Sequence, residues 1–421
     1  MNDFEQRDGQ LWCEDVPLSR IAEAVGTPVY IYSSASIARH ARVIREAVAG
    51  SGSGDPLVAY AIKANPNAAV LALVAAGGLG ADVVSIGEYR RALAAGIAPD
   101  EIVFSGVGKT ADEIAEALTG GVLQFNAESV EELNLLSAVA TAAGRTAPVA
   151  LRVNPDVAPS THAKITTGSA DNKFGIPAGE TVSASRAARA LPNVELVGLA
   201  VHIGSQITSL DPMRAAFECL GRLIAELRAD GAEVRTADLG GGLGVIYDQA
   251  AQAPPLPQQF GEMVRAVASG WDARLIFEPG RLIVANAGVL LSRVVRIKAG
   301  IGAPWVIVDA AMNDLMRPSL YEAYHAIEAV APRGSRIVAN VVGPICETGD
   351  TFALARDMDR TEAGDLVVFR SAGAYGATMS SSYNSRPLPP EVLVEGDRWA
   401  IVRRRVTIDE VAGVVQPQWS R

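Results

Sequence analysis

The feature that most constrains this chain is a regular alternation of apolar runs and helical stretches between Leu57 and Arg281. Eight β-branched or apolar runs recur there, and they predict eight strands. The runs cover residues 57–65, 80–86, 101–107, 122–129, 148–155, 194–205, 233–242 and 273–281. Eight strand–helix units predict a closed (β/α)8 barrel, or TIM barrel. An open doubly wound sheet is the alternative, because periodicity does not show whether the edges of a sheet meet.

Three of the predicted helices have a clear start signal. A hydroxyl residue precedes a glutamate by three positions, which is the capping-box pattern. The pairs are Ser85 with Glu88, Thr110 with Glu113, and Ser129 with Glu132. Glycines at 120, 121 and 144 provide the matching stops.

The pattern changes after about residue 286. Strand-like segments follow one another closely, separated by Gly and Pro, and this predicts an all-β domain, either a sandwich or a barrel. The N-terminal residues, which include TPVYIYSS, are expected to add a strand to it. We therefore expect three parts: residues 1–33 joining the β domain, residues 34–286 forming the barrel, and residues 287–421 forming the β domain.

Composition excludes several classes of function. The net charge is −10 at pH 7, which disfavours nucleic acid and acidic membranes as partners. The polar, acidic N-terminus is unlike a signal peptide, and no apolar run reaches a membrane span, so we expect a cytoplasmic protein. The three cysteines are far apart and odd in number, which argues against a disulfide framework and against a metal site.

Two glycine-rich segments resemble nucleotide-binding motifs but fail their spacing. SGVGKT at residues 105–110 lacks the first glycine of a phosphate loop, because position 103 is Val. GGGLG at residues 240–244 would need a sixth-position glycine where Val245 stands, and it follows the seventh strand instead of the first. We interpret the two segments as a strand end with a helix cap and as a turn.

Functional groups of a barrel gather at the C-terminal ends of its strands, and four such ends carry polar groups here. They hold Lys63, His202, the glycines at 240–242, and Glu278 with Arg281. Each has an ordinary structural interpretation: a lysine in an ion pair, a core histidine, a tight turn, and an acid–base pair. Together they place an amine, an imidazole, a glycine-rich anion cradle and a carboxylate at one barrel mouth.

Pyridoxal phosphate requires such a set of groups. It needs a lysine that forms an imine, a cradle for its phosphate, a side chain against its ring and a partner for its pyridine nitrogen. An acid such as Glu278 keeps that nitrogen protonated, so the ring accepts the electron pair left when a bond to Cα breaks.

Several motifs then resemble a known family. AIKAN, GADVVSIGE, RVNPDV, HIGSQI, DLGGGLG, EPGR, GPICETGD and GAYGATMSSSYNSRP look like segments of the alanine-racemase-like barrel group of pyridoxal-phosphate decarboxylases, in the family's order. Within that group the likeness is to the enzymes that act on diaminopimelate. The resemblance covers nearly the whole chain and implies the same fold, a (β/α)8 barrel with a β domain.

The resemblance also implies roles for individual residues. Lys63 is the Schiff-base lysine, His202 packs on the cofactor ring, and Glu278 pairs with the pyridine nitrogen. Phosphate contacts are implied for Ser205, Gly240, Gly241 and Gly242, and contacts to the cofactor are implied, through EPGR, for Gly280 and Arg281. Substrate contacts are implied for Arg281, Arg317, Tyr321, Glu347 and Tyr375, with Cys346 as proton donor and Tyr375 also touching the cofactor.

The implied reaction is the decarboxylation of meso-2,6-diaminopimelate to L-lysine and carbon dioxide, the last step of lysine biosynthesis. The implied active unit is a homodimer with shared active sites. Sister decarboxylases of ornithine, arginine, lysine or carboxynorspermidine are the first alternative, but these tend to have Asp where Glu347 stands. A non-enzymatic pyridoxal-phosphate barrel protein and a barrel aldolase using Lys63 are the others.

Overall fold

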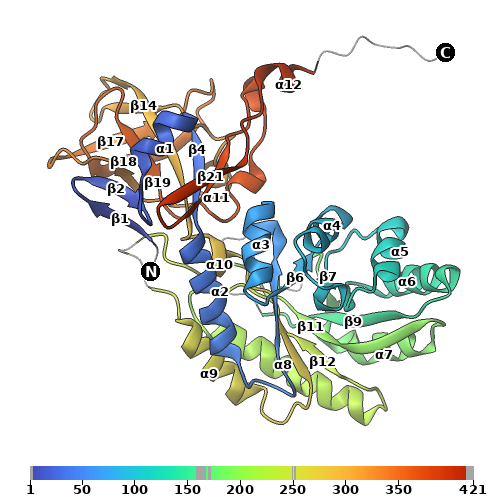
Figure 1. The fold of residues 1–421 in the computed structure, drawn as a ribbon. Helices are drawn as coiled ribbons and strands as arrows, with labels where there is room; N and C mark the ends of the chain where they lie inside the picture. Colours follow the sequence, from blue (N-terminus) through green and yellow to red (C-terminus); the bar gives the residue numbers. More distant parts are fainter. Residues whose placement is uncertain (1–2, 158–166, 169–171, 249, 251–252, 414–421) are drawn as a thin grey trace, which may run out of the picture. The chain divides into compact units, whose positions relative to one another are not determined.

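The computed structural model describes residues 3–157, 167–168, 172–248, 250 and 253–413. The chain forms two compact units. The barrel unit comprises residues 37–283, and the β unit combines residues 1–36 with residues 284–421. Figure 1 colours the chain from blue to red, and both ends of that scale lie in the β unit.

Eight parallel strands close into a barrel, which confirms the fold predicted from the alternation. The closing pairs are β13 with β5 and β8 with β9, so the open-sheet alternative is wrong. Each predicted run contains one of these strands. They are β5 (Leu57–Ala61), β6 (Gly80–Val83), β7 (Ile102–Phe104), β8 (Gln124–Ala127), β9 (Ala147–Asn154), β11 (Val194–Val201), β12 (Thr236–Asp238) and β13 (Arg274–Phe277). A two-residue strand, β10 (Ile176–Pro177), pairs with β9 as well.

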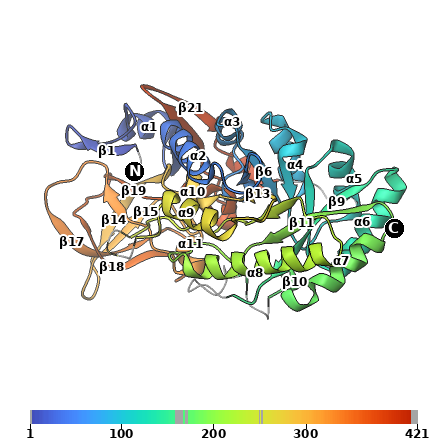
Figure 2. The same cartoon turned by 90° about the horizontal axis from the view of Figure 1, so that it is seen from below.

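Helices cover the outside of the barrel strands, as Figures 1 and 2 show. Most barrel strands are buried along their whole length, since one face meets the barrel interior and the other meets a helix. The helices are α2 (Ser34–Val48), α3 (Ala68–Ala76), α4 (Ile86–Ala94), α5 (Ala111–Gly120), α6 (Val130–Ala143), α7 (Thr181–Ala190), α8 (Asp211–Ala229), α9 (Pro257–Val267) and α10 (Arg281–Val284).

The predicted helix starts are correct in position. Ser85, Thr110 and Ser129 each accept a hydrogen bond from the amide three residues further on. The reciprocal bond is present at Thr110, whose amide donates to Glu113, while in the other two helices the glutamate accepts from the amide just before the cap. The Pro-rich stretch of residues 249–260 predicts a surface loop, and this prediction is wrong at its end, because α9 begins at Pro257. Proline suits the first turn of a helix, where its missing N–H has no partner to lose.

The β unit is sheet-rich, as predicted. Its larger sheet has the order β18-β17-β15-β14-β4-β20-β21, with β19 and β16 attached through β14, and a second sheet has the order β1-β2-β3. The strands are β1 (Phe4–Arg7), β2 (Gln10–Cys13), β3 (Val16–Pro17), β4 (Val29–Ser33), β14 (Gly288–Lys298), β15 (Trp305–Val308), β16 (Ile327–Ala329), β17 (Arg336–Val342), β18 (Thr351–Asp359), β19 (Leu366–Phe369), β20 (Glu391–Glu395) and β21 (Arg398–Arg403). Three short helices accompany them: α1 (Leu18–Val25), α11 (Arg317–Tyr321) and α12 (Ile408–Ala412).

Strand β4 occupies the middle of the larger sheet of this unit. It pairs antiparallel with β14 and parallel with β20, so an N-terminal strand lies between two C-terminal ones. Its residues Val29 and Ile31 are fully buried in the apolar core of the unit, together with Val289 and Val392. That burial explains why the run TPVYIYSS is apolar.

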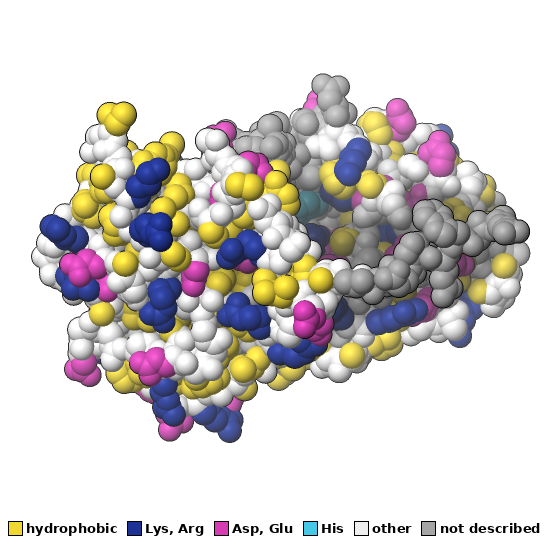
Figure 3. Space-filling model, turned by 90° about the horizontal axis from the view of Figure 1, so that it is seen from above, with side chains coloured by type: hydrophobic (Ala, Val, Ile, Leu, Met, Phe, Trp, Pro, Cys, Tyr) yellow, Lys and Arg dark blue, Asp and Glu magenta, His cyan; other side chains and the backbone are white. Residues whose placement is uncertain are grey.

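The described helices and the charged surface were compared with the requirements of a membrane span and of a basic patch. Within the described part of the chain, the model has no helix that is both long and apolar enough to cross a membrane. On the face shown in Figure 3, lysine and arginine side chains are dispersed among acidic and neutral ones and do not gather into one basic patch.

Candidate active site

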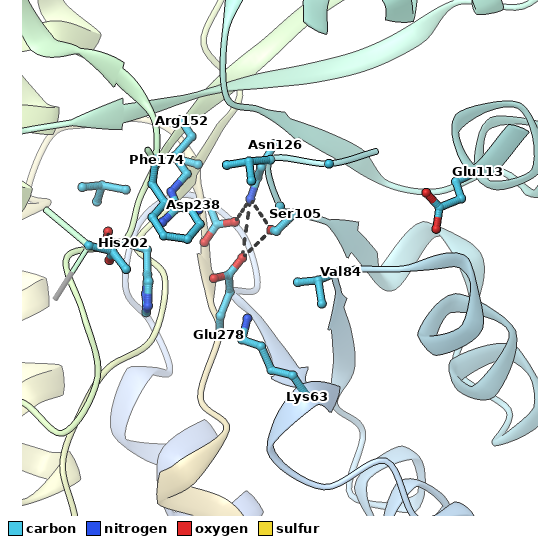
Figure 4. A pocket seen from close by; sticks show the side chains of 16 residues that line it. Lys63, Val84, Ser105, Glu113, Asn126, Arg152, Phe174, His202, Asp238 and Glu278 are labelled. Carbon is cyan, nitrogen blue, oxygen red and sulfur yellow. Dashed lines mark hydrogen bonds between the residues drawn. The ribbon is translucent and has the colours of Figure 1, made fainter. Parts of the chain in front are cut away.

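A cavity of about 420 Å³ lies at the C-terminal ends of the barrel strands. Its lining brings together residues that lie in, or directly after, all eight barrel strands and are far apart in the sequence (Figure 4). The lining includes Lys63, Val84, Ser105, Asn126, Arg152, Thr167, Phe174, His202, Asp238 and Glu278. Three of the residues predicted from the sequence, Lys63, His202 and Glu278, are therefore in one cavity.

Lys63 lies just beyond β5, in a single 3-10 turn formed by Ile62–Ala64. Its Nζ donates to Oδ2 of Asp82 over 2.7 Å. Asp82 is in β6 and is fully buried, while the lysine side chain remains 39% exposed. The ion pair fixes the amine at the wall of the cavity and leaves it accessible.

Glu278 and Asp238 form a pair of buried carboxyl groups that hydrogen-bond to each other. Burial raises the pKa of Glu278 well above its ordinary value, and the charges of Asp238 and Asp82 raise it further. Burial likewise raises the pKa of Asp238, to about 6. The mutual hydrogen bond raises the pKa of Glu278 and lowers that of Asp238, so Glu278 is the donor and the Asp238 carboxylate is the acceptor.

An amide holds both acids in place from the neighbouring strands. Nδ2 of Asn126 donates to Asp238 over 2.8 Å and to Ser105 over 3.1 Å, and it lies 3.5 Å from Glu278. Ser105 in turn donates to Glu278 over 3.3 Å (Figure 4). The amide carbonyl of Asn126 accepts from Gln124, whose own carbonyl accepts from a threonine hydroxyl of β12. The orientation of the acid pair is thus fixed by a buried polar network.

His202 follows β11 and carries an unprotonated Nδ1. The backbone N–H of Gly241 donates to this nitrogen over 3.2 Å, which places the ring proton of a neutral imidazole on Nε2. Burial lowers the pKa of His202 well below its ordinary value, and the cations of Arg152 and Lys63 lower it further. The ring is therefore an uncharged, flat surface at neutral pH.

The turn formed by Gly240, Gly241 and Gly242 after β12 is held by hydrogen bonds from its backbone amides to neighbouring side chains. The amide of Gly240 donates to Oδ1 of Asp238 over 2.9 Å, and the amide of Gly241 donates to His202. A Cβ on Gly241 would lie 2.1 Å from the carbonyl oxygen of Glu278, so no larger residue fits there. The resemblance implies that Gly240, Gly241 and Gly242 contact the phosphate. In this structure the amides of Gly240 and Gly241 instead donate hydrogen bonds to side chains of the protein.

An arginine with two hydroxyl partners lies beside this turn. Arg281, at the start of α10, donates to the hydroxyl of Ser205 over 3.0 and 3.3 Å and to the hydroxyl of Tyr247 over 2.5 Å. Its guanidinium also lies over the Tyr247 ring, 5.7 Å from the centroid. Gly280 precedes it, in close contact with Ala61 and Ala64. The predicted residues Ser205 and Arg281 are therefore in contact, and Tyr247 joins them.

Arg152 and Phe174 form a second wall that the sequence did not reveal. Arg152 is paired with the buried carboxylate of Glu128 over 2.6 Å, and its guanidinium lies 4.8 Å from the centroid of the Phe174 ring. The other carboxylate oxygen of Glu128 accepts from the amide of Gly175 over 2.8 Å. The sequence of residues 156–174 is polar and contains glycine, so it predicts a loop that could act as a lid; most of this segment lies outside the described residues, while Phe174 at its end is held by the contacts above.

The other predicted residues belong to the β unit. Arg317 begins α11 and is buried, and Tyr321 ends the same helix, partly buried. Cys346 and Glu347 are exposed on this unit; the thiol contacts Asn384 over 3.6 Å, and Glu347 accepts from the hydroxyl of Tyr383 over 3.1 Å. Tyr375 is partly buried and has a left-handed backbone, with φ of 55°. None of these residues lines the cavity of the barrel unit.

Sequence reasoning missed the acids Asp82 and Asp238 and the amide Asn126. Each lies within a barrel strand, where apolar residues surround it. A buried acid in an apolar strand needs a partner, so GADVV and TADLG carried a signal that could have been used. Asn126 gave no such signal, because an isolated asparagine in a strand is compatible with many environments.

Comparison with known proteins gives the family. Residues 34–285 match the model of the pyridoxal binding domain of pyridoxal-dependent decarboxylases. The chain is 53% identical to a diaminopimelate decarboxylase of Zymomonas mobilis, over 97% of both chains, and 49% identical to one of Pseudomonas aeruginosa, over 98% of both.

A solved structure agrees with these relatives. It is the diaminopimelate decarboxylase of M. jannaschii in co-complex with L-lysine, which superposes with a TM-score of 0.93 at 36% identity and covers 99% of both chains. The chain therefore belongs to the pyridoxal-dependent decarboxylases, within the diaminopimelate decarboxylase family.

Proposed function

We propose that this chain decarboxylates meso-2,6-diaminopimelate to L-lysine and carbon dioxide, with pyridoxal phosphate as its cofactor. The observation that carries the proposal is the cavity that combines Lys63, a buried acid with a raised pKa and a neutral imidazole, in a chain 53% identical to a diaminopimelate decarboxylase. The related structure in co-complex with L-lysine supports the class of product.

The residues around the cavity fit pyridoxal phosphate. Lys63 is an accessible amine that can hold the aldehyde, and Arg281 with Ser205 offers a cation and a hydroxyl to the phosphate. Bound there, the cofactor supplies an aldehyde that captures the substrate amine and an electron-poor ring that accepts the electrons of the breaking carbon–carbon bond.

Protons are placed by the protein before any ligand binds. Glu278 holds a proton for a pyridine nitrogen, and the contact to Asp238 keeps that acid in one orientation. Lys63 must lose a proton before its amine can attack an aldehyde, and the Asp82 carboxylate, 2.7 Å away, is placed to accept it. His202 stays neutral, so it covers a ring face without adding a second cation.

The substrate carries an amino-acid head at each end, and the far head needs both signs of charge. We assign its carboxylate to Arg317, with Arg281 and Tyr321 as further contacts, and its ammonium to Glu347. Arginine suits the carboxylate because its planar fork donates two parallel hydrogen bonds. Glu347 stands where the sister decarboxylases tend to have Asp, and Arg317 is present for a far carboxylate, and both features favour the diaminopimelate assignment.

We assign the protonation of the product carbon to Cys346, with Tyr375 beside it. The thiol is exposed on the single chain, and so is Glu347. Groups that act on a substrate work best where water is excluded, so their exposure supports a homodimer in which a second copy covers them.

The substrate assignment is tested by measuring carbon dioxide release from meso-diaminopimelate by the purified protein, with and without added pyridoxal phosphate. We expect turnover that depends on the cofactor and at least a hundredfold lower release from ornithine, arginine, lysine and carboxynorspermidine. Preference for one of these would favour a sister decarboxylase. Bound cofactor without release from any amino acid would favour a non-enzymatic carrier.

The dimer assignment is tested by mixing two inactive variants, Lys63→Ala and Cys346→Ala. If each site takes Lys63 from one copy and Cys346 from the other, random exchange restores one intact site in each mixed dimer, or about a quarter of wild-type activity. Sedimentation velocity on the same samples reports the assembly. A monomer, or a mixture that stays inactive after exchange has been verified, would contradict shared sites.

A further inference from the structure

The β unit contains a buried arginine–histidine pair that no role assigned above explains. Nη1 of Arg317 lies 2.8 Å from Nε2 of His325, and the two residues are 5% and 2% exposed. An arginine side chain has only donors, so Nε2 of the histidine must present its lone pair. The ring is therefore the acceptor in this contact.

The other ring nitrogen gives an independent check on that assignment. Nδ1 of His325 lies 2.8 Å from the backbone carbonyl oxygen of Arg370, which can only accept. Nδ1 must therefore carry the hydrogen. Both contacts require the same neutral tautomer, with the proton on Nδ1 and the lone pair on Nε2.

The backbone around His325 is held on both sides. Its own carbonyl accepts from Nη1 of Arg356 over 2.8 Å, and the next carbonyl, that of Ala326, accepts from the amide of Arg370 over 2.9 Å. The guanidinium of Arg356 also lies 4.0 Å from the centroid of the Tyr324 ring. The imidazole is thus a fixed support and not a mobile side chain.

A neutral acceptor has a particular consequence for Arg317. A carboxylate in the place of His325 would orient the guanidinium equally well, but its charge would compete with any anionic ligand. The imidazole fixes one N–H direction and leaves the net positive charge unchanged. Such a cation suits a ligand carboxylate, because a planar guanidinium can bind a carboxylate by two parallel hydrogen bonds.

We propose that His325 is a positioning residue, which sets the Arg317 guanidinium for the carboxylate at the far end of the substrate and so contributes to the choice of substrate. The proposal rests on the function proposed above, in which Arg317 binds that carboxylate. It adds a residue that touches no substrate atom and acts only through Arg317.

Two matched variants separate the two ring contacts. His325→Gln places an amide oxygen near the position of Nε2, so it retains an acceptor for Arg317. His325→Asn places an amide nitrogen near Nδ1, so it keeps the bond to Arg370 but cannot reach Arg317. Two competing ligands report the effect: L-lysine carries the far carboxylate, and 1,5-diaminopentane lacks it. The preference is the ratio of their inhibition constants in the cofactor-loaded enzyme.

We expect His325→Asn to reduce the preference for L-lysine about tenfold, as for one lost hydrogen bond to a charged group, and His325→Gln to stay within about threefold of wild type. In His325→Asn the KM for meso-diaminopimelate should rise while kcat changes little, because the far head takes no part in bond breaking. Equal losses in both variants, or a loss in kcat alone, would overturn the proposal.

Arg317→Met distinguishes this proposal from the one on which it rests. If Arg317→Met leaves the preference unchanged, the assignment of Arg317 to the carboxylate is wrong. If it abolishes the preference while His325→Asn does not change it, the role of His325 is wrong. In the double variant, His325→Asn should add nothing further, and an additional loss would indicate damage that does not pass through Arg317.

A measurement on the unaltered protein keeps the proposal testable if His325→Asn fails to fold. The chain has four histidines, so ¹⁵N labelling of histidine gives few ring signals, and His325→Gln identifies the one from His325. We expect the signature of a neutral ring with its proton on Nδ1. A charged ring, or one with the proton on Nε2, cannot accept from Arg317 and would overturn the proposal.

Discussion

Replacing Asp238 by Asn should change how the stability of the cofactor-free protein depends on pH. The substitution keeps the size of the side chain and the oxygen that accepts from Gly240, but it removes one charge from the acid pair. The pKa of Asp238 is raised from 3.8 to about 6 in the folded protein, mainly by burial. A shift of about two units corresponds to about 3 kcal/mol of free energy.

The sign follows from where the proton is held. Because the folded-state pKa is the higher one, the folded protein binds more protons than the unfolded chain between about pH 4 and pH 6. The stabilising effect of that extra proton is present at low pH and is lost as the pH rises through 6. The variant has no such group, so its stability should not fall in this window on account of residue 238.

The variant also loses a hydrogen bond, since Asn126 now faces a second amide where it had a carboxylate at 2.8 Å. The lost hydrogen bond lowers the stability of the variant by about 1.5–3 kcal/mol. Because this loss does not change as residue 238 titrates, the change of the stability difference with pH is the informative quantity. Urea unfolding of wild type and variant, followed by circular dichroism, should give a stability difference that moves about 2 kcal/mol in favour of the variant between pH 4.5 and pH 8.

The control is Asp397→Asn, which removes an exposed carboxylate from the turn between β20 and β21. Its stability should run parallel to that of wild type across the same pH range. If Asp238→Asn also ran parallel to wild type, Asp238 would not be a buried acid that titrates near pH 6, and the proton-sharing pair would have to be abandoned.

Three further predictions concern the barrel. Lys109→Met should destabilise the protein by about 3–5 kcal/mol in urea unfolding, because it leaves the carboxylate of Glu132 without its buried partner at 2.6 Å, and adding Glu132→Gln should recover part of the loss. Tyr247→Phe should weaken pyridoxal phosphate binding severalfold in fluorescence titrations, since Arg281 loses a hydroxyl acceptor, and unchanged affinity would exclude a role for that contact. Gly241→Ala should lower the melting temperature and the cofactor affinity together, because its Cβ meets a carbonyl oxygen at 2.1 Å, and an unaltered melting temperature would show that the turn can relax.

The barrel could be predicted because its strands are buried on both faces. Such strands read as continuous apolar runs, and β5 and β11 were found for that reason. The exact strand ends were less predictable. The apolar run 57–65 predicts one continuous strand, but the backbone leaves β5 at Ala61 and forms a 3-10 turn. Hydrophobicity does not distinguish these conformations, because both bury the same side chains.

The candidate site was predictable only in part. Lys63, His202 and Glu278 stand at strand ends, where the geometry of a barrel brings them together, and the structure places all three at one cavity. Asp82 and Asp238 stand inside strands and were missed. Hydrophobic periodicity does not indicate which residues of the β unit contact a ligand. The assignment of Arg317 and the other residues of this unit came from the resemblance, and it stays a prediction.

The position of β4 sets an order of events during synthesis. Residues 37–283 form a continuous stretch, so the barrel can complete itself while the ribosome is still translating the remainder. β4 emerges before all of them, yet its neighbours begin at Gly288 and Glu391. The apolar strand β4 must therefore wait through most of translation before the strands that pair with its two edges have been synthesised.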